Sequence, residues 1–110
     1  AWIPPELREG GAELEAAAGG ALPQLIERAD ITGVVHCHST YSDGKATIRE
    51  MVDSARARGW RYLGITDHSQ AAFYAGGLSP ARVRDQHAEI DALNAELAGE
   101  FTILKGIEAD

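Results

Sequence analysis

The sequence predicts an α/β fold in which short parallel strands alternate with helices. From residue 31 onward the chain reads strand, helix, strand, helix, strand. Each predicted strand is a short apolar or β-branched run, and each predicted helix has apolar residues at helical spacing between capping signals. Strands connected in this way are parallel and joined by right-handed crossovers. This is the topology of an α/β barrel or of an open doubly wound sheet, and three strands complete neither.

Residues 1–30 are expected to form a helical lead-in, or linker, that docks on the main body. The segment is rich in Ala, Glu and Gly, and residues 12–18 are predicted to form a helix that ends at Gly19. Residues 22–30 are predicted to form a second short helix, with Pro23 in its first turn.

The main body begins with a strand predicted in residues 32–38, a β-branched run bounded by Gly33. A capping box of Thr47 and Glu50 starts the following helix, and Gly59 ends it. The apolar residues at helical spacing in that helix are Ile48, Met51, Val52 and Ala55.

A second strand is predicted in residues 61–68, and its nearly continuous apolar run suits a strand that is covered on both faces. Ser79 as N-cap and Pro80 at the first helical position begin a long helix, which Gly99 ends. Its buried stripe is expected to be Val83, Ile90, Leu93 and Leu97. The third predicted strand lies in residues 101–110.

The composition is that of a globular protein, and it excludes some classes of function. The 110 residues are 45% hydrophobic and 25% charged, unlike a disordered chain. A net charge of −7 argues against a nonspecific nucleic-acid clamp, which needs a basic surface. With one cysteine, no signal peptide and no apolar run of about 18 residues, we expect a cytoplasmic protein without a membrane span. The chain lacks an initiator Met and stops just after an apolar run, so we expect a piece of a longer protein.

Ionisable side chains stand at the carboxyl ends of all three predicted strands, where parallel strands build their sites on one rim. They are His36, His38, Asp43, His68 and Glu108. In a strand, His36 and His38 point to one face and Cys37 to the other. His-x-His alone is often a chance pair, and Ser-Asp-Gly around Asp43 is also an ordinary turn signal. The three strand ends together favour a site.

Imidazole and carboxylate ligands together favour Zn²⁺, Mn²⁺ or Fe²⁺ over Ca²⁺ or Mg²⁺. Five candidate ligands exceed the need of one tetrahedral ion, so we predict a cluster of two or three ions bridged by Glu108. Metals about 3.5–4 Å apart activate water and clamp the oxygens of a phosphate, which predicts phosphoester hydrolysis by a metal-bound water without a protein nucleophile. Asp67 is predicted to orient a ligand or cap a loop, and His87 to pack on the apolar stripe of its helix.

Three motifs carry a family resemblance: HCHSTYSDG at residues 36–44, ITDHS at 65–69 and GIEAD at 106–110. They resemble the first motifs of the polymerase and histidinol phosphatase (PHP) family. Three segments, WIPPELREG, GAELEAAAGG and LPQLIERADITG, resemble the linker that joins the thumb of bacterial family X DNA polymerases to their C-terminal PHP domain, so residues 1–30 are expected to come from the thumb side. The segment from Ala75 to Leu97 is also similar to this subgroup. Val34 stands where the first motif of the family often has Asp.

The resemblance implies a distorted (β/α)7 barrel with a metal site of up to three ions, Mn, Zn or Fe. It implies that His36 and His38 bind one ion, that Asp43 and His68 bind another, and that Glu108 bridges them. The family's remaining ligands lie on later strands. Residues 31–110 then form about three βα units, the N-terminal part of the domain, and are expected to be inactive or weakly active alone.

The resemblance also implies a function: metal-dependent 3′–5′ exonuclease or related repair activity on DNA, with a polymerase core in the same chain. A small-molecule phosphatase of the histidinol phosphatase type and a non-catalytic structural module are the alternatives. The exposed edge of a three-stranded parallel sheet is expected to allow the fragment to self-associate.

Overall fold

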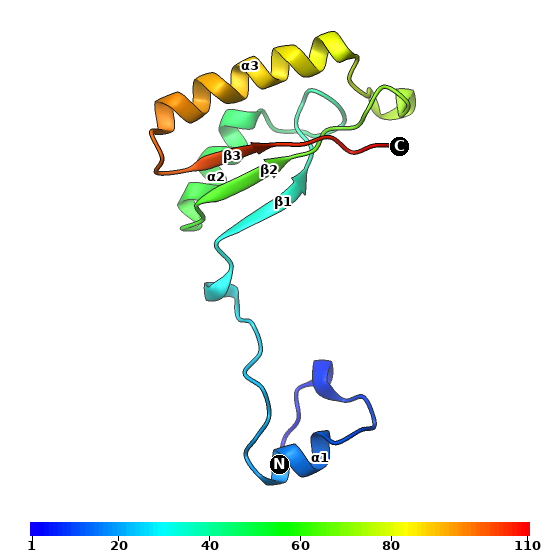
Figure 1. Cartoon of the computed structure of the whole chain (residues 1–110), viewed down its shortest axis with the longest axis vertical. Helices are drawn as coiled ribbons and strands as arrows, with labels where there is room; N and C mark the ends of the chain where they lie inside the picture. The colour runs from blue at the N-terminus through cyan, green and yellow to red at the C-terminus, as the bar shows by residue number, and fades with distance from the viewer.

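The computed structural model describes all of residues 1–110, which form an α/β body and an N-terminal segment that extends away from it (Figure 1). The radius of gyration of the Cα atoms is 19.4 Å, whereas a compact chain of this length has about 13 Å. The body holds a three-stranded parallel sheet in the order β1-β2-β3. None of the helices is both long enough and apolar enough to span a bilayer.

The helices and strands follow the predicted order from β1 onward. They are α1 (Glu13–Ala18), β1 (Gly33–Cys37), α2 (Ile48–Ala57), β2 (Tyr62–Ile65), α3 (Pro80–Leu97) and β3 (Thr102–Lys105). Short 3₁₀ turns lie at Pro5–Leu7, Arg28–Asp30 and Phe73–Ala75.

The N-terminal segment differs from its prediction in two respects. Only α1 forms, because residues 21–27 have no regular structure and are followed by a single 3₁₀ turn. The expected docking on the body is also wrong: Leu14 and Ile26 remain 72% and 81% exposed, and the segment lies apart from the sheet (Figure 1). A short helix gains most of its stability from packing an apolar face, and these residues find no surface to pack against.

The two long helices begin where their capping signals predict. The side chain of Thr47 accepts a hydrogen bond from the amide of Glu50, whose carboxylate accepts one from the amide of Thr47. The side chain of Ser79 accepts a hydrogen bond from the amide of Arg82, and Pro80 is the first residue of α3. The caps satisfy amides that have no partner within the helix, so they fix where each crossover turns back along the sheet.

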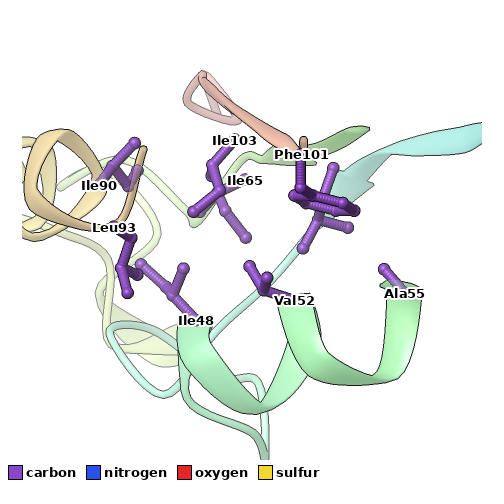
Figure 2. Close-up of a cluster of buried hydrophobic side chains, with 9 residues drawn as sticks. Ile48, Val52, Ala55, Ile65, Ile90, Leu93, Phe101 and Ile103 are labelled. Atoms are coloured by element: carbon purple, nitrogen blue, oxygen red, sulfur yellow. The ribbon is translucent and has the colours of Figure 1, made fainter. Parts of the chain in front are cut away.

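One hydrophobic core lies between the sheet and both helices (Figure 2). Its buried residues are Ile48, Val52, Ala55, Leu63, Ile65, Ile90, Leu93, Phe101 and Ile103. In the stripe predicted for α3, Ile90 and Leu93 are buried, whereas Val83 and Leu97 are half-buried.

The other face of the sheet has no helix on it, so the prediction that the second strand is covered on both faces is wrong. Val35 is 59% and Leu104 is 44% exposed on that face. Gly64 of β2 is buried and lies close to its neighbour strand, since a Cβ atom at this position would lie 3.0 Å from Val35 Cα. The apolar run in β2 therefore has two causes. One face of the strand is covered by the helices, and on the other face Gly64 lies close to the neighbouring strand.

Candidate metal centre

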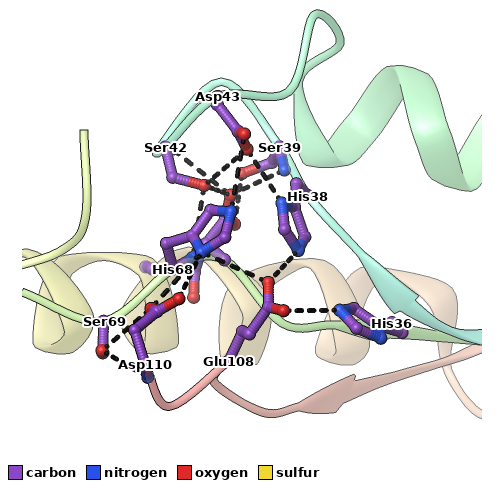
Figure 3. Close-up of polar contacts among 11 residues, drawn as sticks. His36, His38, Ser39, Ser42, Asp43, His68, Ser69, Glu108 and Asp110 are labelled. Atoms are coloured by element: carbon purple, nitrogen blue, oxygen red, sulfur yellow. Dashed lines mark hydrogen bonds and ion pairs between the residues drawn. The ribbon is translucent and has the colours of Figure 1, made fainter. Parts of the chain in front are cut away.

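The carboxyl ends of the three strands meet at one rim, where the side chains of the five predicted ligands point toward one another (Figure 3). Beyond the regular sheet, the backbones of His68 and Glu108 continue the parallel pairing of β2 and β3. The amide of Glu108 donates to the carbonyl of Asp67, and the amide of Ser69 donates to the carbonyl of Glu108. The backbone itself therefore holds His68 beside Glu108.

A β-bulge orients the two histidines of β1. Val34 pairs with Leu63 and Cys37 with Ile65, so β1 has one residue more than β2 between these pairs. His36 lies in this stretch with a φ of 67°, an uncommon conformation for a residue other than glycine. Bulges of this kind redirect side chains next to active sites. The ring centroids of His36 and His38 are 5.4 Å apart, while Cys37 packs against the core.

Glu108 lies at the centre of the histidines. Its Oε1 is 3.4 Å from His36 Nε2, and its Oε2 is 2.9 Å from His38 Nε2 and 3.2 Å from His68 Nδ1. One carboxylate thus contacts side chains from the ends of β1 and β2. This is the position expected of a bridging ligand.

Asp43 closes the cluster from the loop after β1. Its Oδ1 lies 2.8 Å from His38 Nδ1, and its Oδ2 lies 3.5 Å from His68 Nε2. The hydrogen bond with His38, supported by the charges of both histidines, lowers the pKa of Asp43. Burial works to lower the pKa of His68, but the hydrogen bond to Asp110 and the charges of Glu108, Asp110 and Asp43 together raise it.

Potential ligand atoms form three overlapping groups, and within each group they lie within 4.8 Å of one another. The groups are His36, His38 and Glu108; His38, Asp43 and His68; and His68, Glu108 and Asp110. Asp110 is not among the predicted ligands, and its Oδ1 lies 3.2 Å from His68 Nδ1. Its spacing of two residues from Glu108, which places side chains on the same face of an extended chain, is the signal that could have identified it.

The chemistry of these donors fits a divalent cation. The atoms His38 Nε2 and Glu108 Oε2 are buried and lie 2.9 Å apart, and neither has a hydrogen-bond partner. Buried polar atoms normally have a hydrogen-bond partner. A nitrogen and a carboxylate oxygen that converge without one are arranged as ligands of a common ion, and imidazole with carboxylate suits Zn²⁺, Mn²⁺ or Fe²⁺.

Comparison with known proteins identifies the family. The PHP domain model matches residues 35–110, which include all five predicted ligands. The chain belongs to the PHP family. It is 49% identical over 108 residues to the protein named "DNA polymerase/3'-5' exonuclease PolX" of Bacillus subtilis (strain 168). That alignment covers 98% of the PHP chain and 18% of the relative, so the chain spans less than two thirds of the relative's length.

Asp67 lies behind the predicted ligands of the PHP chain and holds the loop that carries Asp43. Its side chain is buried, with 1% exposure. Oδ1 accepts hydrogen bonds from the amides of Ser39 and Ser42 at 2.8 and 3.2 Å, and Oδ2 accepts one from the hydroxyl of Ser39 at 2.7 Å. The side-chain amide of Gln86 in α3 donates to Oδ2 at 2.6 Å. The network connects the rim of the PHP domain to α3.

Gln86, which is 2% exposed, is not among the predicted site residues. A polar residue three positions after Val83 and four before Ile90, within an apolar stripe, is the signal that indicates a buried hydrogen-bonding role.

Tyr41 fixes the same loop of the PHP chain at a second point. Its hydroxyl donates to Glu89 Oε2 at 2.6 Å, and the guanidinium of Arg82 lies 4.6 Å from the centre of its ring. Burial, followed by the hydrogen bond and charge of Glu89, raises the pKa of Tyr41 to about 12. The loop between His38 and the start of α2 is therefore attached to α3 directly through Glu89 and Arg82, and indirectly through Asp67, to which Gln86 donates.

Proposed function

We propose that this PHP chain belongs to a metal-dependent phosphoesterase that hydrolyses phosphodiester bonds of DNA, in the manner of a 3′–5′ exonuclease in repair, within a family X DNA polymerase. The convergence of three histidines on Glu108, with Asp43 beside two of them, carries this proposal. The similarity to a protein named as a polymerase and 3′–5′ exonuclease supports the choice of DNA as substrate.

The proposed ligand set is His36 and His38 for one ion and Asp43 and His68 for another, with Glu108 between them. Bound Mn²⁺, Zn²⁺ or Fe²⁺, with up to three ions in the whole domain, would activate water and stabilise negative charge on the phosphate oxygens. The hydrogen bond from His38 Nδ1 to Asp43 would hold the proton on Nδ1 and leave Nε2 free to bind metal. Asp67 would keep the loop of Asp43 in place without contacting an ion.

We further propose that residues 31–110 are the N-terminal part of a distorted (β/α)7 barrel and that residues 1–30 are the linker that precedes it. Both α2 and α3 pack on the same face of the sheet, and the strands follow one another in chain order. A barrel has its helices outside and its strands in sequence. On this interpretation, Val35 and Leu104 face the barrel interior.

The test uses the full-length protein with Mn²⁺ and compares Glu108→Gln with His87→Ala. Glu108→Gln keeps the size of the side chain but removes the charge between three histidines. We therefore expect at least a tenfold loss of both Mn²⁺ affinity and nucleotide release from single-stranded DNA. Losing a group that only supports a metal ligand already lowers affinity or activity about 10- to 100-fold. His87 is the matched control, because it is the one histidine that belongs to none of the three ligand groups.

The same assay separates the alternatives. Wild-type protein that releases phosphate from small monoesters but no nucleotides from DNA would indicate a small-molecule phosphatase. Protein that binds no Mn²⁺ and hydrolyses neither substrate would indicate a structural module. Equal activity of Glu108→Gln and wild type would contradict the proposed metal centre.

A further inference from the structure

Two aromatic side chains stand exposed next to the candidate metal centre. Phe73 and Tyr74, in the 3₁₀ turn Phe73–Ala75, are 86% and 75% exposed. The ring centroid of Tyr74 lies 6.4 Å from that of His68, and the rings of Phe73 and Tyr74 are 6.1 Å apart with an interplanar angle of 78°. The aromatic pair, as we call Phe73 and Tyr74, therefore borders a ligand of the rim.

The turn that carries the aromatic pair is firmly attached to the body. Ala72 and Leu78 on either side of it are buried, with 0% and 3% exposure. The amide of Leu78 donates to the carbonyl of His68 at 2.8 Å, and the amide of Gly77 donates to that of Ala72 at 3.0 Å. A Cβ atom at Gly77 would collide with the carbonyl of Ser69. The chain thus packs small residues closely under the turn and directs its two large rings outward.

The position of the aromatic pair indicates what it would bind. A phosphodiester held at the rim brings the bases of its own nucleotides within reach of a ring that neighbours His68. Exposed aromatic rings bind unpaired bases by stacking, whereas the bases of a duplex are already stacked on each other. With a net charge of −7, the chain has little attraction for the phosphate backbone. Stacking would therefore supply much of its affinity for a nucleic acid.

We propose that Phe73 and Tyr74 form a stacking platform for unpaired bases at the end of the DNA strand whose phosphate lies at the metal centre. This inference rests on the proposed function and specifies its substrate as a single-stranded end. The aromatic pair favours strands that carry bases over phosphodiesters that lack them.

The test compares wild-type full-length protein with the double variant Phe73→Ala/Tyr74→Ala. The substrates are a single-stranded oligonucleotide and the same oligonucleotide with abasic terminal positions. Wild type is expected to have a lower KM for the strand with bases, by about 5- to 150-fold per stacked ring. The double variant is expected to have the same KM for both strands, close to the KM of wild type for the abasic strand. Loss of activity on both strands to the same extent, or no change on either, would overturn the proposal.

A binding measurement distinguishes this proposal from the proposed function. With EDTA present, a terminal 2-aminopurine base is expected to lose fluorescence on wild-type protein and not on the double variant, whether or not DNA is cleaved. Quenching that is equal in both proteins, or absent from both, would overturn the platform. If wild-type protein quenches the fluorescence but does not cleave DNA in Mn²⁺, the stacking platform is supported and the proposed hydrolase activity is contradicted.

Conservative variants separate stacking from general apolar contact. Tyr74→Phe and Phe73→Tyr keep the rings and are expected to bind like wild type, whereas Tyr74→Leu is expected to bind like Tyr74→Ala. Trp2→Ala is the matched control, because Trp2 is a 72% exposed aromatic residue in the N-terminal segment away from the rim. Because both rings of the pair are exposed, unchanged thermal unfolding is expected and would show that the variants fold.

Discussion

His68 is the residue on which the charges of the rim converge. Its Nδ1 lies within 3.2 Å of both Glu108 Oε2 and Asp110 Oδ1, and Asp43 Oδ2 lies 3.5 Å from its other nitrogen. Three carboxylates around one ring favour the imidazolium ion when no metal is bound. A cation that binds there must displace a proton, so proton and metal compete for the same side chain.

This competition predicts a pH dependence with a defined sign. The pKa of His68 is raised above its usual value of 6.5, so in the metal-free protein the imidazolium stabilises the fold at low pH. That contribution is lost as the pH rises through the raised pKa. We expect Mn²⁺ affinity to increase over the same range, with proton release.

Calorimetric titration with Mn²⁺ in buffers of different ionisation enthalpy measures these protons, and His68→Asn should release fewer of them. His87→Asn is the control. The same proton release from wild type and His68→Asn would contradict this account.

At the scale of elements, the loop after β1 depends on a buried carboxylate. Asp67 accepts hydrogen bonds from the backbone and side chains of Ser39 and Ser42 and from Gln86. Each of these groups donates to the carboxylate. In Asp67→Asn, the NH₂ group of the asparagine would replace one acceptor oxygen and face groups that now donate to it. The geometry of Asp43 at the rim thus depends on a carboxylate whose own hydrogen bonds go to Ser39, Ser42 and Gln86 and not to the predicted ligands.

We expect Asp67→Asn to lower the free energy of unfolding by about 1–3 kcal/mol, the cost of leaving a buried donor without an acceptor. Mn²⁺ affinity should fall as well, because Asp43 is no longer held beside His38. Urea unfolding of the metal-free protein measures the first effect and calorimetry the second. Asp53→Asn, an exposed change on α2, is the control. Stability and affinity equal to wild type would show that the loop needs no such support.

The elements that the sequence predicts correctly are those with local signals. The caps of Thr47 and Ser79 act within one turn of their own helices, so the starts of α2 and α3 could be predicted. The second helix expected in residues 22–30 depends on a packing partner, which no local pattern reveals.

The site was partly predictable for the same reason. Parallel strands bring their ends together, so the meeting of the three histidines and Glu108 followed from topology, whereas Asp43 reaches the rim through a loop. The bulge at His36 depends on how two strands pair, and the role of Gln86 depends on how α3 lies over the loop. Neither is visible in a single segment of sequence.

On the scale of the whole molecule, the sheet is covered on one face only. Parallel sheets are normally covered on both faces. Here Val35 and Leu104 are exposed on the open face, and β1 and β3 are both edge strands. Open edges and exposed apolar side chains favour association with another chain.

We therefore expect the 110-residue chain to form dimers or larger species as its concentration rises, measured by sedimentation velocity. Val35→Lys/Leu104→Lys should shift it to the monomer, because charges on the open face oppose its burial. Leu14→Lys is the control, since Leu14 is exposed in the N-terminal segment. A monomer at every concentration, or association that the double change leaves as it was, would contradict this expectation.

The bulge at His36 has a consequence for how this position tolerates change. A φ of 67° costs most residues about 1–2 kcal/mol of steric strain, which glycine avoids although it loses more backbone entropy on folding. His36→Gly would relax the backbone while removing an imidazole from the rim, so a more stable protein would be a poorer binder of metal. If the proposed metal centre is correct, stability and metal binding make opposite demands on this one residue.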